Sequence, residues 1–292
     1  MSTDSNISST LSDRSSGPFA GLADWVADWG AVTIEGISAA GKIALFSWQT
    51  LSWLLFRRPR KSTLLPIFYQ VGVLSLPVVA LTGTFIGMVL AVQTFFHFRE
   101  LRMETELGAV INMSLARELG PVLAATMLAG RVGSAMAAEL GTMRVTEQID
   151  ALSSMGANPI QYLVVPRFLA FVLLIPALTV MAIFMGVVGG YFYSVVILGI
   201  DKHHYLYNTQ EFVDSFDLFT GMFKSVFFGI AIALVSCYQG FNCRAGAEGV
   251  GKAATSAFVH SFVLILGLDL LLGITLDSFY YMLWPEGASL FQ

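Results

Sequence analysis

The chain has few charged residues and few residues of the kinds that soluble enzymes use for chemistry. Only 12% of its 292 residues are charged, against about a quarter in soluble domains, and 55% are hydrophobic. It holds four histidines and two cysteines. Together with a mean hydropathy of +0.71, this composition indicates an integral membrane protein.

The scarce polar residues also exclude several classes of protein. The 16 Lys and Arg are scattered, so no basic stripe predicts binding to nucleic acid. Cys237 and Cys243 fit neither a CxxC redox pair nor a zinc site, and we expect two reduced thiols. The sequence has no HExxH and no paired carboxylates at metal-ligand spacing. It therefore predicts no catalytic residues, no metal site and no cofactor on this chain.

The N-terminal region is polar at first and then apolar with regular interruptions. Residues 1–18 are Ser-rich and lack the basic start and apolar core of a secretory signal, which predicts a disordered cytoplasmic tail. Residues 19–61 carry Asp24, Asp28 and Glu35 on one helical face, which favours an amphipathic helix in the membrane interface. The RRPRK cluster at 57–61 ends it and predicts a cytoplasmic elbow.

Five later regions are long and apolar enough to cross a bilayer, which needs about 20 residues. They are residues 64–96, 110–143, 168–200, 225–243 and 253–284. The fold class predicted is all-α, with the interfacial helix and a five-span domain over 62–285, leaving 286–292 as a short outer tail. Glycines in the first and third regions, such as Gly83, Gly87 and Gly186, predict close helix packing.

The orientation follows from the charges of the connecting segments. A cytoplasmic RRPRK cluster places Arg144, Arg167, Arg244 and Lys252 inside, whereas the outer connections are mostly acidic. The N-terminus is therefore predicted to be cytoplasmic and the C-terminus periplasmic.

Ionisable residues inside spans cost about 2.5 to 3.5 kcal/mol each on insertion scales, so they are expected to face a cavity or a partner. Placed on helices, five of them converge in the outer half of the membrane: Arg117, Glu118, Lys224, Asp269 and Asp277. Two interpretations stay open, internal ion pairs between helices or a polar cavity for a lipid headgroup. Arg131 and Glu139 are expected to stabilise packing instead.

The stretch GAEGVGK at 246–252 has the glycine and lysine frame of a phosphate-binding P-loop. A P-loop requires Ser or Thr after the lysine as a magnesium ligand, and Ala253 stands there. The neighbouring sequence is also apolar on both sides, where a P-loop needs a buried strand before it and a helix after it. We interpret 246–252 as a glycine-rich loop between two spans.

The connection between the second and third spans is predicted to contain a short amphipathic helix over 145–155, ended by Gly156 and Pro159. Ile149, Leu152 and Met155 form its apolar stripe, and Glu147 and Asp150 are expected to be exposed. A rigid helix outside the bilayer, joined to two spans, would suit the transmission of force from a soluble partner.

The block from Glu118 to Ala170, ELGPVLAATMLAGRVGSAMAAELGTMRVTEQIDALSSMGANPIQYLVVPRFLA, closely resembles the MlaE/YrbE family of ABC-transporter permeases. GAEGVGKAAT and the LGLD at 266–269 are similar to that family too. The resemblance covers roughly residues 30 to 283. It implies a permease subunit that moves phospholipid or a related lipid between inner and outer membranes, driven by a separate ATPase.

The resemblance also implies partners and roles. It implies a homodimer in the bacterial inner membrane, bound to cytoplasmic ABC ATPase subunits that carry ATP and magnesium, with a periplasmic MCE-domain lipid-binding protein outside. A small cytoplasmic STAS-domain subunit is a further candidate partner. By motif, Arg117 and Glu118 in RELGP, Lys224 in FKS and Asp269 in LGLD would line or support the lipid cavity. The coupling helix would present Glu147, Gln148, Asp150, Leu152 and Met155.

Two other classes remain as alternatives. A proton-coupled secondary transporter could use Asp269 and Glu118, although such folds often contain two repeats and five spans do not divide that way. A membrane-embedded enzyme would have only His97, His203, His204 and His260 to draw on. The histidines in the outer connection are expected to be solvated, and His260 to be hydrogen-bonded to a neighbour.

Overall fold

The structure is a computed structural model that describes residues 30, 33–34, 38, 41–54 and 61–283. The predicted N-terminal tail, most of the basic elbow and the C-terminal tail lie outside these residues. The chain consists of two units, Met1–Phe46 and Ser47–Gln292. Residues 41–54 are helical, and Leu45, Trp48 and Leu51 are exposed on this helix. Exposed apolar residues three apart lie near one another on a helix, as an interfacial helix requires.

Among the residues that the structure describes, five helical segments are long and apolar enough to cross a membrane, which confirms the predicted number. The first, Thr63–Glu100, contains α2 (Lys61–Val71), the 3-10 turn η1 (Val73–Ser75) and α3 (Leu76–Glu100). Gly72 N–H donates to the Phe68 carbonyl at 2.8 Å where α2 ends. Pro77 follows in the first turn of α3, where its missing N–H breaks no helical hydrogen bond.

The second segment, Glu104–Val145, is interrupted by two π-helical turns. It runs through η2 (Glu104–Glu106), α4 (Leu107–Ser114), the π turn η3 (Leu115–Leu119), α5 (Gly120–Leu128), the π turn η4 (Ala129–Gly133) and α6 (Ser134–Val145). Pro121 is the second residue after the first π turn and donates no hydrogen bond, which favours a widened turn before it. Arg117, Glu118 and Arg131 all lie in π turns, which often mark functional sites.

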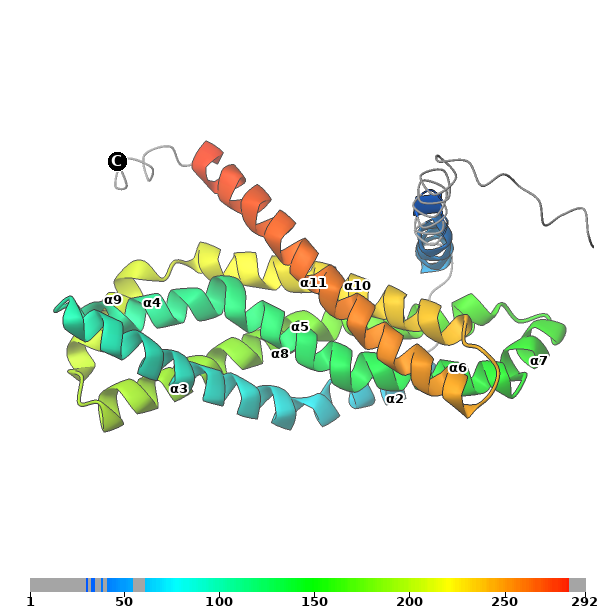
Figure 1. Cartoon of the computed structure of the whole chain (residues 1–292), viewed down its shortest axis with the longest axis horizontal. Helices are drawn as coiled ribbons and strands as arrows, with labels where there is room; N and C mark the ends of the chain where they lie inside the picture. The colour runs from blue at the N-terminus through cyan, green and yellow to red at the C-terminus, as the bar shows by residue number, and fades with distance from the viewer. Residues whose placement is uncertain (1–29, 31–32, 35–37, 39–40, 55–60, 284–292) are drawn as a thin grey trace, which may run out of the picture. The chain divides into compact units, whose positions relative to one another are not determined.

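Short helices outside the spans precede the third and fourth segments. Helix α7 (Gln148–Ser154) precedes the third segment, Ile160–Ile197, which contains η5 (Ile160–Val164), α8 (Val165–Tyr191) and η6 (Phe192–Ile197). Helix α9 (Lys202–Phe212) then leads to α10 (Ser215–Phe241), and the last helix is α11 (Ala247–Leu283). Figure 1 shows α7 and α9 at opposite ends of the bundle.

Glycines hold α3 and α8 in backbone contact, as their spacing predicted. A Cβ atom at Gly87 would lie 2.7 Å from the carbonyl carbon of Gly186 and 2.9 Å from the amide nitrogen of Gly190. Gly83 faces the backbone of Ala182 in the same way. No side chain lies between the two helices at these points, so any larger residue would push them apart.

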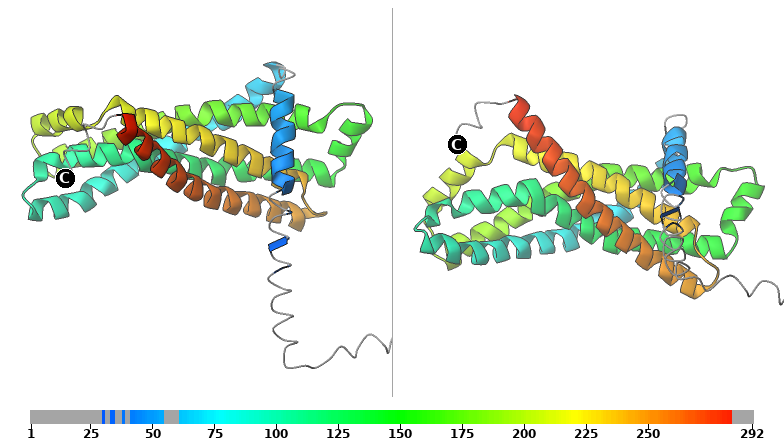
Figure 2. Two further views of the ribbon diagram at one scale, coloured as in Figure 1. Left: turned by 90° about the horizontal axis from the view of Figure 1, so that it is seen from above. Right: turned by 45° about the horizontal axis from the view of Figure 1, so that its top comes forward.

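Helix α11 is the least enclosed of the five segments. In its most apolar stretch only 17% of the residues are buried, against 56% in that of α10. Figures 1 and 2 show that it crosses the bundle obliquely, close to α6 and α10 at its beginning and away from them at its C-terminal end. Phe258, Val263 and Leu270 are among its exposed apolar residues.

Four of the predicted span starts were wrong by six residues or more, and the second begins at Glu104 and not at residue 110. The fourth span begins at Ser215 and not at residue 225, the third at Ile160, and the last helix at Ala247. At the starts of the fourth span and of α11, polar or small residues next to an apolar run continue the helix. At the third span, the helical stretch before residue 168 is itself mostly apolar, IQYLVV. Residues 247–252 are therefore the first turns of α11 and not a loop.

Candidate functional site

Lys224 lies at the centre of an ionic cluster that joins three spans. Its side chain is fully buried, and its ammonium donates to Glu118 Oε2 at 2.7 Å and to Asp269 Oδ1 at 3.1 Å. Glu118 comes from η3, Lys224 from α10 and Asp269 from α11. Lys224 lies nine residues beyond Ser215, about 14 Å along the helix. It is therefore well inside the span, whereas the predicted span started beside it, at residue 225.

Arg117 forms the second half of the cluster. Its Nε donates to Asp217 Oδ1, and its Nη1 lies 4.0 Å from Asp277 Oδ1. The Asp217 side chain is 1% exposed, while that of Asp277 is 57% exposed. The five residues predicted to converge therefore lie in two ion-paired groups, both formed between η3, α10 and α11.

Asp217 was not predicted as a member of the cluster, because the predicted fourth span begins only at residue 225. Asp214 and Asp217 form a reciprocal capping box at the start of α10. The backbone N–H of Asp214 donates to Asp217 Oδ2 at 3.0 Å, which leaves Oδ1 for Arg117. The D-x-x-D spacing is a helix-start signal that could have moved the predicted boundary to Ser215.

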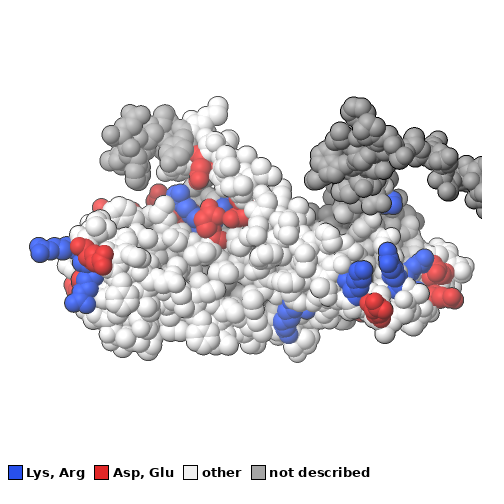
Figure 3. All heavy atoms as spheres, viewed as in Figure 1, with Lys and Arg blue, Asp and Glu red and all other residues white. Residues whose placement is uncertain are grey.

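The cluster contains more acids than bases. Two cations, Arg117 and Lys224, face four carboxylates, those of Glu118, Asp217, Asp269 and Asp277. The Glu118 side chain is 48% exposed and that of Asp269 21%. Figure 3 shows a charged group beside α11, on a middle region that is otherwise mostly uncharged. The cluster thus pairs its charges internally and also presents carboxylates on an open face.

Gly273 of α11 covers the Lys224–Glu118 pair. A Cβ at this position would lie 3.5 Å from Lys224 Nζ and 3.8 Å from Glu118 Oε1. Helix α11 therefore approaches the pair with its backbone. Nothing in the sequence pattern distinguished Gly273 from other glycines of the spans.

Two further basic residues, Arg131 and Arg167, make contacts between spans, and Arg167 pairs with Glu139. Arg131 and Glu139 were expected to stabilise packing. Arg131 Nη1 donates to Ser75 Oγ at 2.8 Å. Arg167 is 7% exposed and donates to Glu139 Oε1 at 2.7 Å and to the Leu163 carbonyl at 2.8 Å. These contacts join the second span to the first and third.

The predicted coupling residues lie on and beside α7. Arg144 Nη1 donates to Asp150 Oδ1 at 2.6 Å, which ties α7 to the end of α6. Glu147 precedes the helix with a φ of 60°, so the chain reverses sharply there. Ile149 is buried and Leu152 half-buried, whereas Met155 is 75% exposed. The predicted apolar stripe is therefore divided, with Ile149 against the protein and Met155 facing outward. Glu147, Gln148 and Asp150 are exposed as well.

The GAEGVGK stretch follows helix α10 and not a strand, which is inconsistent with a P-loop. Two of its three glycines have structural reasons. Gly246 has a φ of 90°, which reverses the chain before α11. At Gly249 a Cβ would lie 2.7 Å from the carbonyl carbon of Arg244, so only glycine permits this contact.

Comparisons with known proteins agree on one family. The profile described as "Permease MlaE" matches residues 64–275. A probable ABC transporter permease protein of Rickettsia felis is 42% identical over 237 residues, 81% of this chain and 92% of that protein. A probable ABC transporter permease protein of Synechocystis is 42% identical over 217 residues, 74% of this chain and 82% of that protein. The Haemophilus influenzae protein named intermembrane phospholipid transport system permease protein MlaE is 34% identical over 252 residues, 86% of this chain and 97% of that protein.

Proposed function

The chain belongs to the MlaE permease family, and from this we propose that it is the membrane-spanning subunit of an ABC transporter that moves phospholipid between the inner and outer membranes. The similar proteins named ABC transporter permease and intermembrane phospholipid transport permease support this function. The observation that carries it is the ionic cluster of Lys224 and Arg117 on the open side of α11. The proton-coupled alternative receives no support from the comparisons.

We place the α7 end of the bundle in the cytoplasm and the α9 end in the periplasm. Arg144, Arg244 and Lys252 lie at or near the α7 end, and Glu104, Glu106 and Asp201 lie near the α9 end. Basic residues accumulate on the cytoplasmic side of membrane proteins, which supports this orientation. The inner membrane of a bacterium with two membranes is the corresponding location.

The cluster would act by exchanging partners. Helix α11 contributes Asp269 and Asp277, each to a cation held by other spans. A lipid phosphate could replace either carboxylate, because both are acceptors for charge-assisted hydrogen bonds of similar strength. Displaced from Lys224 or Arg117, α11 would lose the ionic links that hold it to η3 and α10 at this level. Lipid binding and α11 movement are therefore linked in the proposed mechanism.

Helix α7 would receive the movement of the ATPase. The Arg144–Asp150 pair and buried Ile149 fix α7 to the second span, so that force on α7 moves α6 and the segments before it. ATP and magnesium would be bound by the partner chains. A homodimer, a periplasmic MCE-domain protein and a small STAS-domain subunit complete the proposed assembly, and the exposed face of α11 suits a second copy or lipid.

Co-expression with the neighbouring transporter genes tests this function. We expect the chain to co-purify with an ATPase and to transfer phospholipid between vesicles only when ATP is supplied. Met155→Asp places a charge on the exposed end of α7, so it should abolish ATPase co-purification and transfer. Met103→Asp is the matched control, because Met103 is an exposed methionine near the other end. ATP hydrolysis by the isolated chain, or transfer that needs no ATPase, would contradict the proposal.

A further inference from the structure

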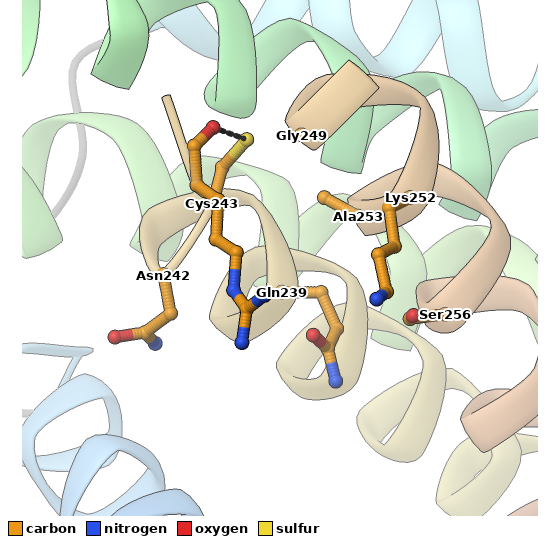
Figure 4. A pocket seen from close by; sticks show the side chains of 8 residues that line it. Gln239, Asn242, Cys243, Gly249, Lys252, Ala253 and Ser256 are labelled. Carbon is orange, nitrogen blue, oxygen red and sulfur yellow. Dashed lines mark hydrogen bonds between the residues drawn. The ribbon is translucent and has the colours of Figure 1, made fainter. Parts of the chain in front are cut away.

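A small basic hollow lies between α10 and α11, away from the ionic cluster. It has a volume of about 150 Å³ and is lined by the polar or basic side chains of Gln239, Asn242, Arg244, Lys252 and Ser256, together with Cys243 and small residues of α11. Figure 4 shows Lys252 and Ser256 on one side of α11, facing Gln239 of α10. No carboxylate lines the hollow.

Within the described part of the chain, no carboxylate lies within 4.0 Å of either cation. Among the residues that the structure describes, no ion pair or side-chain hydrogen bond involves Arg244 or Lys252, whereas Arg117, Arg144, Arg167 and Lys224 all have acidic partners. Two unpaired cations on one hollow attract an anion, and basic pockets between spans on the cytoplasmic side bind lipid headgroups.

The hollow is held in place by the backbone. Gly249 brings the backbone of Arg244 against the first turns of α11, where any Cβ would collide with it. Arg244 is thereby kept beside Lys252. This contact explains one glycine of the P-loop-like stretch.

The size of the hollow limits what it can hold. Pockets for complete small molecules usually measure about 300 to 1,000 Å³, so 150 Å³ is too small for a nucleotide but sufficient for one phosphate group. Below it, Val259 and Val263 follow Lys252 and Ser256 on the same face of α11, and both valines are exposed. An anion bound here would therefore have an apolar helix surface directly beneath it.

We propose that this hollow binds the phosphate group of an anionic membrane phospholipid, with Arg244 and Lys252 as the charged contacts and the acyl chains along Val259 and Val263. The site is separate from the ionic cluster and does not depend on the transport function. It requires only that α10 and α11 span the membrane.

Photoactivatable phosphatidylglycerol in nanodiscs tests the proposal on the full chain. We expect cross-links within residues 239–263, several-fold stronger than with phosphatidylcholine, which carries the same phosphate but no net charge. Arg244→Gln and Lys252→Gln should each reduce labelling about fivefold, the effect of about 1 kcal/mol per basic residue. Lys202→Gln, at the other end of the bundle, is the charge-matched control and should leave labelling unchanged.

Two glycine variants separate the site from general basicity. Gly249→Ala should displace Arg244 and lower labelling, whereas Gly251→Ala should not, because nothing lies within 4 Å of a Cβ at Gly251. Labelling within twofold of wild type in the Arg244→Gln/Lys252→Gln double variant would overturn the proposal. Displacement of the lipid by millimolar inorganic phosphate would assign the site to a free anion. If the lipid does not label the hollow and a bound ATPase subunit covers it completely, the hollow would be assigned to a protein contact. Either result would also overturn it.

Discussion

Replacing Lys224 by methionine tests whether the ionic cluster holds the fold together or serves the substrate. The change shortens the unbranched side chain by one atom and removes the cation that Glu118 and Asp269 share. Two carboxylates would then face each other with no positive partner.

The magnitude follows from the burial of each partner. Removing one member of a buried ion pair costs about 3 to 5 kcal/mol. Here the Glu118 side chain is 48% exposed and can be solvated or protonated, while Lys224 itself is fully buried. We therefore expect a loss of about 2 kcal/mol, or a fall in the unfolding midpoint of about 4 to 8 °C.

A triple variant separates charge balance from function. In Lys224→Met with Glu118→Gln and Asp269→Asn, no uncompensated charge remains, so most of the stability should return. ATP-driven lipid transfer should stay absent, because no ammonium is left for a phosphate. Thermal unfolding in detergent and vesicle transfer measure the two effects, and Lys202→Met serves as the exposed control. If the single variant unfolds like wild type, or if the triple variant transfers lipid normally, the reasoning is wrong.

Two further predictions concern a glycine contact and a thiol. Gly87→Ala should destabilise the protein by about 1 to 3 kcal/mol, because its Cβ would meet the backbone of Gly186 and Gly190. Gly267→Ala should be neutral or stabilising, because nothing lies within 4 Å of a Cβ there, and equal unfolding midpoints for the two variants would contradict this prediction. Burial raises the pKa of the Cys243 thiol. In a Cys237→Ala background, the rate of iodoacetamide alkylation should therefore reach half its maximum at a pH above the ordinary thiol pKa of about 8.5. Rapid alkylation at pH 7 would refute this prediction.

The number of spans could be predicted because it depends on local composition. A bilayer needs about 20 apolar residues for each helix, and the chain supplies five such regions. The ends of the helices could not be read in the same way. Ser215 to Phe223 is helical although it contains Asp217, and Ala247 to Lys252 is helical although it contains two glycines. Asp217 shows the consequence. The predicted fourth span left it outside, whereas it lies buried against Arg117.

The sequence by itself determined that this protein crosses a membrane with five helices, and that its ionisable residues inside the spans had to meet partners. Hydrocarbon tolerates neither unpaired backbone groups nor isolated charges, so both conclusions follow from residue type and spacing. Only the tertiary structure decided which charges pair. Lys224 binds Glu118 and Asp269 while Arg117 binds Asp217, because the π turn η3 and the oblique course of α11 set which side chains lie within reach. The tertiary structure also placed Arg244 beside Lys252, through a glycine contact that no periodicity reveals.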